Sequence, residues 1–217
     1  MLFNQQLDWN NLNTLKENLQ NKVEHVRFTQ LLDFTELNTE VDLQMLKEAG
    51  VHCVKFHSYV QQIFDAEFER IIDICKIAEK LEMPICVDAS YGTNQLYDLD
   101  NLKLVASISQ QVQKTPIIIL HSGGARIFDA MLIAESTPNV FLETSFSMEY
   151  YKGSSIEKDI LFAYKKLGSK KVLYASDAPA LGSLQDSIDF QLVRIAEMGF
   201  NSNELDDIFY NNAINLF

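Results

Sequence analysis

The chain has 217 residues, of which 47% are hydrophobic and 22% charged, a composition typical of globular proteins that excludes disorder along the whole length. Lysine and arginine number 18 against 30 aspartates and glutamates, so the formal net charge is −12 and the average surface repels nucleic acid and anionic membranes. One core buries about 70% of the unfolded surface of a chain this long. We therefore expect a single domain over residues 1–217, with no nucleic-acid or membrane partner.

The cysteines indicate a reducing compartment. Cys53, Cys75 and Cys86 are odd in number, lack C-x-x-C spacing and lie in apolar stretches, so we interpret them as buried thiols. The N-terminus has no basic segment followed by an apolar one, and the purest apolar run, 117–120, falls far short of the roughly 20 residues of a membrane helix. The sequence predicts a soluble cytoplasmic protein.

The predicted elements alternate between amphipathic helices and short β-branched strands. Residues 1–25 are expected to form an N-terminal helical segment, because Leu12, Leu15 and Leu19 recur at helical spacing over 10–23. The predicted strands are 26–34, Val51–His57, Ile85–Asp88, 117–121, 140–144 and 171–176. The predicted helices are one capped by Asn38 or Thr39 and ending near Ala49, then 65–81, 99–113, Ile127–Ser136 and Ser155–Leu167, with further helices up to Phe217. This α/β repeat fits an open parallel sheet or a (β/α) barrel.

Polar side chains end several of these strands, and ligands of parallel α/β folds bind at the carboxyl ends of strands. Period-two alternation places Lys55 and His57 on one face of their strand and His52 on the other. The pair then converges on one site. In the alternative reading, His57 caps a loop and Lys55 faces solvent.

Two later strands end in residues suited to metal binding or proton transfer. His121 follows a buried strand and precedes Gly123 and Gly124, which permit close backbone approach; the alternative is a histidine satisfied by a neighbouring carbonyl. Asp177 ends the sixth strand, where a buried carboxylate needs a compensating partner; the alternative is an Asx cap of the following turn.

Acidic residues also end the third and fifth strands, at Asp88 and Glu143, and either one could simply be solvated. His57, Asp88, His121 and Asp177 together make a nitrogen and oxygen ligand set of the kind that binds zinc, manganese or iron.

Two further patterns are weaker. The Gly123 to Arg126 turn opens a helix and could hold a phosphate or carboxylate, although it lacks a full nucleotide-binding motif. An aromatic group could line an apolar pocket or could simply pack in the core; its members are Phe141, Phe146, Tyr150 and Tyr151.

Three motifs on successive strands resemble the amidohydrolase-related (amidohydrolase 2) family of metal-dependent TIM-barrel hydrolases and decarboxylases. They are Val54-Lys55-Phe56-His57, His121-Ser122-Gly123-Gly124 and Ala175-Ser176-Asp177-Ala178-Pro179. Residues 211–217 are similar to the closing helix of that family, and the resemblance spans about residues 26–217.

The resemblance implies an incomplete TIM-like barrel of about six βα units, equivalent to strands three to eight of the family. His121 would be the strand-six histidine and Asp177 the strand-eight aspartate, a metal ligand or general base. No two of the four histidines are separated by two positions, so the family's first-strand His-x-His pair is not found, and Asp88 stands where the fifth-strand histidine is expected. A truncated or split homologue is one reading, with its open edge covered by the N-terminal helix, an upstream segment, a partner chain or another copy in a homo-oligomer.

The leading functional hypothesis is a metal-dependent hydrolase of an amide, ester or lactone bond in a small-molecule substrate. Asp177 and His121 would be catalytic, and a divalent metal, zinc before others, would be held by His57, Asp88, His121 and Asp177. Residues expected to bind substrate are Lys55, Arg126 and Glu143. The alternatives are a decarboxylase of the same family and a non-catalytic barrel that binds a ligand or partner.

Overall fold

The computed structural model describes residues 26–36, 38–180 and 182–217. These residues form one sheet of six parallel strands in the order β1-β2-β3-β4-β5-β6, so each strand pairs with its neighbour in sequence. The strands are β1 (Phe28–Leu31), β2 (Val51–His57), β3 (Ile85–Asp88), β4 (Ile117–Leu120), β5 (Val140–Glu143) and β6 (Val172–Leu173). This confirms the predicted α/β class with about six βα units. Within the described chain the barrel is not closed, because β1 and β6 are the two edges.

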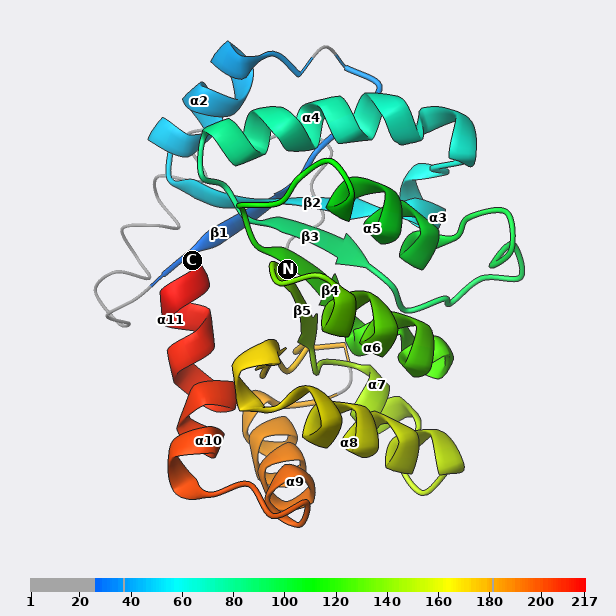
Figure 1. Cartoon of the computed structure of the whole chain (residues 1–217), viewed down its shortest axis with the longest axis vertical. Coiled ribbons are helices and arrows are strands. Elements are labelled where there is room, and N and C mark those ends of the chain that lie inside the picture. Colours follow the sequence, from blue (N-terminus) through cyan, green and yellow to red (C-terminus); the bar gives the residue numbers. More distant parts are fainter. Residues whose placement is uncertain (1–25, 37, 181) are drawn as a thin grey trace.

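Helices connect the strands and cover the outer side of the curved sheet (Figure 1). The α-helices are α2 (Glu40–Glu48), α3 (Ser58–Gln61), α4 (Phe68–Lys80), α5 (Asn101–Ser109), α6 (Ile127–Ser136), α7 (Ser147–Tyr150), α8 (Ser155–Leu167), α9 (Leu184–Ala196), α10 (Ser202–Asp206) and α11 (Asn212–Leu216). The 3₁₀ segments are η1 (Asp65–Glu67), η2 (His121–Arg126) and η3 (Ser169–Lys171), and η4 (Asp207–Asn211) is a π-helix. None of the described helices is long and apolar enough to cross a membrane. The helix predicted over 10–23 lies outside the described residues.

The two faces of the sheet bury different residues, as strand alternation requires. Val54 and Phe56 of β2 point to the helices and join the main core. Cys53 points the other way and joins a small cluster on the inner face with Cys86, Ile118 and Leu120, against which Phe217 packs. Lys55 and His57 share this inner face by the same alternation, so they stand on the side where a barrel encloses its site.

Local capping explains several helix starts. Thr39 forms a capping box with Asp42 at the start of α2, which confirms one of the two predicted caps. Asp100 caps α5 by accepting a hydrogen bond from the Lys103 N–H, so this helix begins at Asn101 and not at residue 99. The helix predicted over 65–81 begins with the 3₁₀ turn η1 and continues as α4.

The sixth strand is much shorter than the predicted 171–176. After Leu173 the Tyr174 N–H donates to Ile208 O at 2.8 Å, and the Ala175 N–H donates to the Thr144 hydroxyl at 3.1 Å. The backbone N–H groups after Leu173 therefore bond to groups outside the sheet, and the strand ends there. The first strand is likewise confined to Phe28–Leu31, inside the predicted 26–34.

Candidate active site

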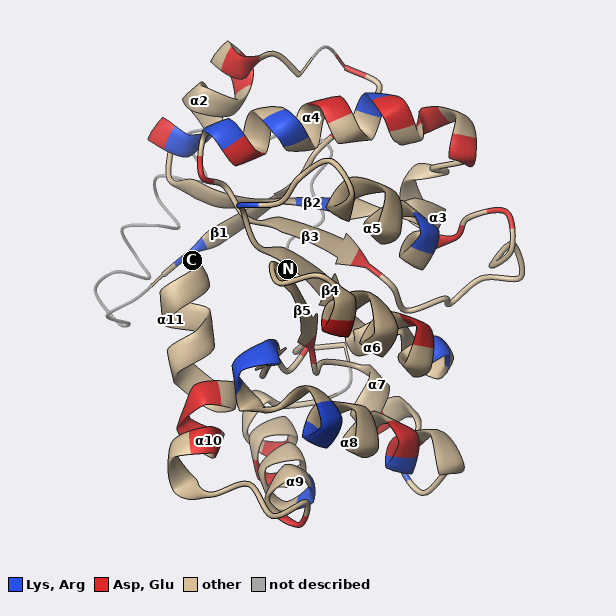
Figure 2. Ribbon diagram, viewed as in Figure 1, with Lys and Arg blue, Asp and Glu red and all other residues tan. Residues whose placement is uncertain are grey.

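The carboxyl ends of four neighbouring strands bring the candidate side chains to one edge of the sheet. His57 lies opposite Asp88 in the register of β2 and β3. Asp88 lies opposite Leu120, the residue before His121. Glu143 ends β5, the next strand along. The acidic tip of β3 is visible in Figure 2. The sequence-based expectation that these residues share one site agrees with this placement.

Asp88 is the centre of a buried ionic cluster. Its Oδ2 atom lies 2.9 Å from His121 Nε2, 3.4 Å from Lys55 Nζ and 3.5 Å from His57 Nε2. All four residues are at most 6% exposed. Lys55 therefore pairs with Asp88, and the alternative in which it faces solvent is wrong.

The other Asp88 oxygen is held by groups that sequence reasoning missed. Oδ1 accepts hydrogen bonds from the Ser90 N–H at 3.1 Å and the Ser90 hydroxyl at 2.8 Å. The Ser90 hydroxyl lies 2.8 Å from the Tyr59 hydroxyl, and the Tyr59 ring meets the His57 ring edge-on with centroids 4.2 Å apart. Both Asp88 oxygens are thus fixed in position.

Glu143 fixes His121 from the opposite side. Its Oε2 accepts from the His121 N–H at 3.0 Å and from the Ser145 hydroxyl at 2.8 Å, and its Oε1 accepts from the Ser145 N–H at 2.7 Å. Ser145 Oγ also lies 3.0 Å from His121 Nδ1. Glu143 was expected to bind substrate, but its two oxygens are engaged in positioning His121 and Ser145.

The surroundings of the two histidines in this cluster shift their pKa values in opposite directions. Burial opposes the charged form of His121, but the hydrogen bond and charge of Asp88, with Glu143 and Asp177 nearby, raise its pKa to about 9. Burial lowers the pKa of His57 to about 4, and Lys55 and His121 add to this effect against the attraction of Asp88. Burial would raise the pKa of Asp88, yet His121, His57 and Lys55 hold it well below its usual value.

His121 sits at the start of an unusual turn. Residues 121 to 124 have successive φ values of +60°, +51°, +78° and +54°, all in the left-handed region. The Ser122 hydroxyl donates to Glu143 O at 2.7 Å, and the Ser147 hydroxyl donates to His121 O. Backbone held in such conformations is concentrated at functional sites. The Gly-Gly pair was the sequence signal for this turn.

Asp177 approaches the cluster from the loop after β6. It is half-buried, and within the described chain its carboxylate has no hydrogen bond. Its charge acts on both His121 and Tyr59. The Asx-cap alternative does not describe it, because the residue two positions on is Pro179, which has no N–H, and the Ala180 N–H donates to the main-chain oxygen of Asp177 at 2.8 Å. Asp177 thus has a carboxylate open to interact with a substrate or water.

Arg126 belongs to a separate cluster. Its guanidinium pairs with Asp100 and Asp129, each at 2.8 Å, and lies over the Tyr91 ring at 5.0 Å from the centroid. This group is already matched by two carboxylates and does not join the Asp88 cluster.

The aromatic residues divide between the site and its surroundings. Phe146 meets the His121 ring edge-on at 5.6 Å and stacks on Tyr150 at 5.0 Å. Tyr151 packs against the main core, while Phe141 lies beneath the Lys171 ammonium.

The predicted metal ligands do not form a ligand shell. No three His, Cys, Asp or Glu side chains of the described ranges are grouped so as to hold a metal ion. Both histidines point their Nε2 atoms at the same Asp88 oxygen, and the Lys55 ammonium occupies a third position around it. In this arrangement the residues do not fit a divalent ion.

The chain is similar to a known protein family and to several solved structures. The model of the amidohydrolase family matches residues 18–217. An uncharacterized TIM-barrel protein from Bordetella bronchiseptica superposes with a TM-score of 0.73 at 14% identity, over 97% of this chain and 72% of that one. A probable 2-pyrone-4,6-dicarboxylic acid hydrolase from Acinetobacter baumannii gives 0.67 at 16% identity, over 94% and 76%. A dihydroorotase from Saccharomyces cerevisiae gives 0.58 at 11%, over 92% and 71%. No curated protein matches the chain.

Proposed function

This chain belongs to the amidohydrolase family, and from that premise we propose that it hydrolyses an amide, ester or lactone bond of a small molecule at the carboxyl edge of its sheet. The observation that carries the proposal is the buried contact of 2.9 Å between His121 Nε2 and Asp88 Oδ2, together with the nearby carboxylate of Asp177, which has no hydrogen bond among the described residues. Burying a charged group costs free energy unless the group is paired and hydrogen-bonded. Residues with strongly shifted pKa values are concentrated at active sites.

Asp177 is the general base of the proposed reaction. A carboxylate that is half-buried and without a hydrogen bond in the described chain is available to accept a proton from an attacking water. Its position on the loop directly after β6 places it on the same edge as His121. The proton moves from water to a carboxylate oxygen as the water oxygen attacks the carbonyl carbon.

His121 and Lys55 supply positive charge to the oxygen that becomes negative during this attack. Both are buried beside Asp88, where low polarity strengthens electrostatic interactions. Asp88 and Glu143 act as positioning residues, since each is bound to His121 and to a serine of its own loop. The groups are thus oriented before a substrate arrives.

The names of two structural neighbours support the choice of bonds. One is a 2-pyrone-4,6-dicarboxylic acid hydrolase by name and another a dihydroorotase. The family is generally metal-dependent, so the zinc expected from the sequence is tested together with the activity, although the described side chains present no ligand shell for it. The competing function is a non-catalytic barrel that binds a ligand or partner, favoured by the sheet that stays open between β1 and β6.

A substrate panel tests the proposal. The full chain would be assayed with dihydrocoumarin as a lactone, 4-nitrophenyl acetate as an ester and 4-nitroacetanilide as an amide, each with zinc, with manganese and with a chelator. We expect hydrolysis of at least one compound, lost in a His121→Ala, Asp177→Ala double variant. Elemental analysis of both proteins reports bound metal. No hydrolysis under any of the three conditions would support the non-catalytic function, and equal rates in the two proteins would contradict the roles proposed for His121 and Asp177.

A further inference from the structure

Two aromatic side chains lie beside the candidate active site and have no role in the proposed mechanism. The Phe146 ring meets the His121 ring edge-on with centroids 5.6 Å apart. It also stacks on the Tyr150 ring at 5.0 Å, with an angle of 17° between the two planes. We call Phe146 and Tyr150 the aromatic wall. The wall extends from the charged cluster at the strand ends to Tyr150, the last residue of α7.

Core packing does not account for the aromatic wall. Neither ring joins the main core or the inner-face cluster of the described chain, although Met148 and Tyr151 from the same segment pack in the main core. Phe146 is half-buried and Tyr150 is 63% exposed, so most of the Tyr150 side chain is open to an incoming molecule. Covering apolar surface of this kind is favourable. The wall therefore offers an accessible apolar surface at the edge of the site.

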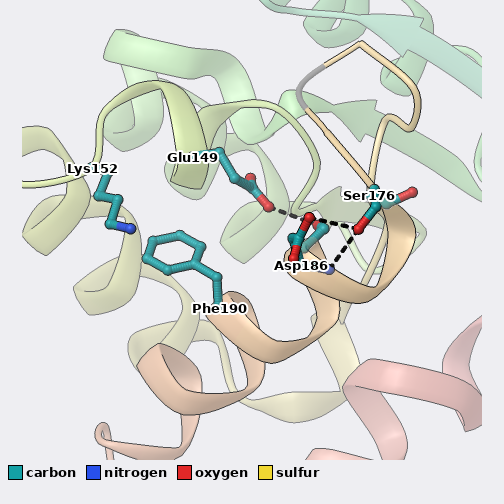
Figure 3. A pocket seen from close by; sticks show the side chains of 7 residues that line it. Glu149, Lys152, Ser176, Asp186 and Phe190 are labelled. Atoms are coloured by element: carbon teal, nitrogen blue, oxygen red, sulfur yellow. Dashed lines mark hydrogen bonds between the residues drawn. The ribbon is translucent and has the colours of Figure 1, made fainter.

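The local structure holds the wall in place before a ligand arrives. Phe146 has a φ of +59° and a ψ of −59°, and its carbonyl accepts a hydrogen bond from the Tyr150 N–H at 2.8 Å, which places the two rings one turn apart. Glu149 lines a pocket that α7 shares with α9, and its Oε1 accepts from the Ser187 hydroxyl at 2.7 Å (Figure 3). This bond to α9 holds the segment that carries both rings, so a ligand has little of the wall left to order.

The geometry of the wall favours an aromatic ring over a saturated one. Aromatic pairs in offset-stacked or edge-on geometry gain free energy beyond the area that they bury. The wall already shows both geometries, in the stack of Phe146 on Tyr150 and in the edge contact of Tyr150 with Tyr151 at 5.0 Å. A further ring on the exposed part of Tyr150 extends this stack. Because Phe146 lies between Tyr150 and His121, that ring is several bonds away from a group held at the strand ends.

We propose that the aromatic wall binds an aromatic ring of a small molecule, which stacks on Tyr150 while Phe146 supports Tyr150 from the side of the active site. The identification of this molecule as the substrate rests on the proposed function. It makes the substrate an ester, amide or lactone whose acyl part carries an aryl group a few bonds from the carbonyl carbon. It also makes Tyr150 a specificity-determining residue. The ring-binding surface itself stands on the geometry alone.

Ligand-observed saturation-transfer NMR with the full chain tests the wall, and the probes are 3-phenyl-1-propanol and 3-cyclohexyl-1-propanol. Neither alcohol can be hydrolysed, and the saturated one is the more hydrophobic, so a surface that is merely apolar would prefer it. We expect the phenyl compound to bind saturably and more tightly. Tyr150→Leu should weaken its binding about three- to tenfold, the range expected for one aromatic pair, with little effect on the cyclohexyl compound. Tyr210→Leu is the matched control, because it replaces a ring that is 54% exposed on η4, and it should change neither affinity.

Three results would overturn the proposal. The first is no saturable binding of 3-phenyl-1-propanol by the wild type. The second is an affinity for the cyclohexyl compound that equals or exceeds the affinity for the phenyl compound. The third is a Tyr150→Leu variant that binds the phenyl compound as tightly as the wild type does.

Two esters separate this inference from the proposed function. In methyl 3-phenylpropanoate and methyl 3-cyclohexylpropanoate, saturated carbon atoms insulate the ring from the carbonyl and keep the intrinsic reactivities alike. For a hydrolase, Tyr150→Leu should raise KM for the phenyl compound without changing kcat and should leave both constants for the cyclohexyl compound as in the wild type. Equal KM values of the wild type for the two esters would overturn the substrate assignment. Asp177→Asn should bind 3-phenyl-1-propanol like the wild type and lose hydrolysis, whereas ring binding without hydrolysis in the wild type would contradict the function and leave the ring-binding surface in place.

Discussion

At the scale of single residues, Asp88 holds two histidines of opposite proton affinity on one carboxylate oxygen. His121 at 2.9 Å gains enough from Asp88 to overcome burial, so its pKa rises to about 9. His57 at 3.5 Å shares the oxygen with Lys55, and burial lowers its pKa to about 4. At neutral pH one imidazole is charged and the other neutral, a separation that assigns acidic and basic roles in active sites.

This pair predicts a stability maximum near pH 6.5, the ordinary histidine pKa. Between pH 6.5 and about 9 the folded state keeps a proton on His121 that the unfolded state has lost, so the free energy of unfolding falls as the pH rises. Below pH 6.5 the unfolded state protonates His57 and the folded state resists until about pH 4, so stability falls as the pH drops. Urea denaturation across this range measures both limbs. His121→Gln should flatten the alkaline limb, and an unchanged slope would refute its raised pKa.

Removing the Asp88 charge should destabilise the fold. Asp88→Asn leaves Lys55 and a protonated His121 buried without their carboxylate, and breaking such a pair costs roughly 3–5 kcal/mol. Asp177→Asn is the matched control, because this half-buried side chain has no hydrogen bond to lose in the described chain and should change the free energy of unfolding by no more than about 0.5 kcal/mol. Similar losses in the two variants would contradict the central role of Asp88.

The sequence located the charged residues of this site better than their partners. Strand alternation correctly placed Lys55 and His57 on one face, and the strand-end rule gathered Asp88, His121 and Asp177 at one edge. The hydroxyls of Ser90 and Ser145 were missed because serine is common in every loop, and only the folded chain shows which serine meets a carboxylate.

At the scale of elements, the loops after β3, β4, β5 and β6 share a backbone feature. Each contains a non-glycine residue with positive φ: Tyr91, His121, Phe146 and Asp177. Such conformations cost of order 1–3 kcal/mol each and persist only where surrounding contacts fix them. Their collection at the edge that carries the charged cluster supports a functional reason for these turns.

This turn tolerates no side chain at Gly123, where an added Cβ would lie 2.9 Å from Ala130 Cβ, or at Gly124. The φ of +54° and ψ of −128° at Gly124 are accessible essentially to glycine, and an added Cβ there would lie 3.2 Å from Ser90 O. Gly124→Ala should therefore destabilise the fold by about 1–3 kcal/mol and lower activity, because it disturbs the loops of both His121 and Asp88. Gly153→Ala is the control, since its φ is +79° and nothing lies within 4 Å of the added Cβ. Thermal unfolding of both variants gives the comparison, and an equal loss would show that close packing at Gly124 adds nothing.

Turn and capping residues in the sequence predicted the bounds of helices and strands well where those bounds depend on local interactions. Val51–His57, Ile85–Asp88 and Ile127–Ser136 begin and end as predicted. The sequence could not give the end of β6, because Tyr174 and Ala175 take their partners from η4 and from the Thr144 side chain. The short helices α3 and α7 were missed, since a single turn leaves no periodic pattern.

At the scale of the whole molecule, the fold is a six-stranded part of a barrel with its edges at β1 and β6. The end of the chain reaches the beginning of the sheet, because Arg27 Nε donates to Phe217 O at 3.0 Å and Phe217 packs on the inner-face cluster. The order of the strands followed from the βα repeat, whereas the choice between barrel and open sheet depended on curvature, which periodicity does not encode. The partner chain or homo-oligomer expected to cover an open edge stays a prediction, which sedimentation of the full chain would measure.

The most direct test of the proposed function is kcat/KM for the panel compound that the wild type hydrolyses, measured for Asp177→Asn and Asp189→Asn. Loss of a general base lowers the rate by about 10²–10⁴-fold, and we predict a decrease in this range for Asp177→Asn. Asp189 is an exposed residue of α9 and does not belong to the charged cluster at the strand ends, so Asp189→Asn should have the same kcat/KM as the wild type. Full activity in Asp177→Asn, or equal losses in the two variants, would contradict the account.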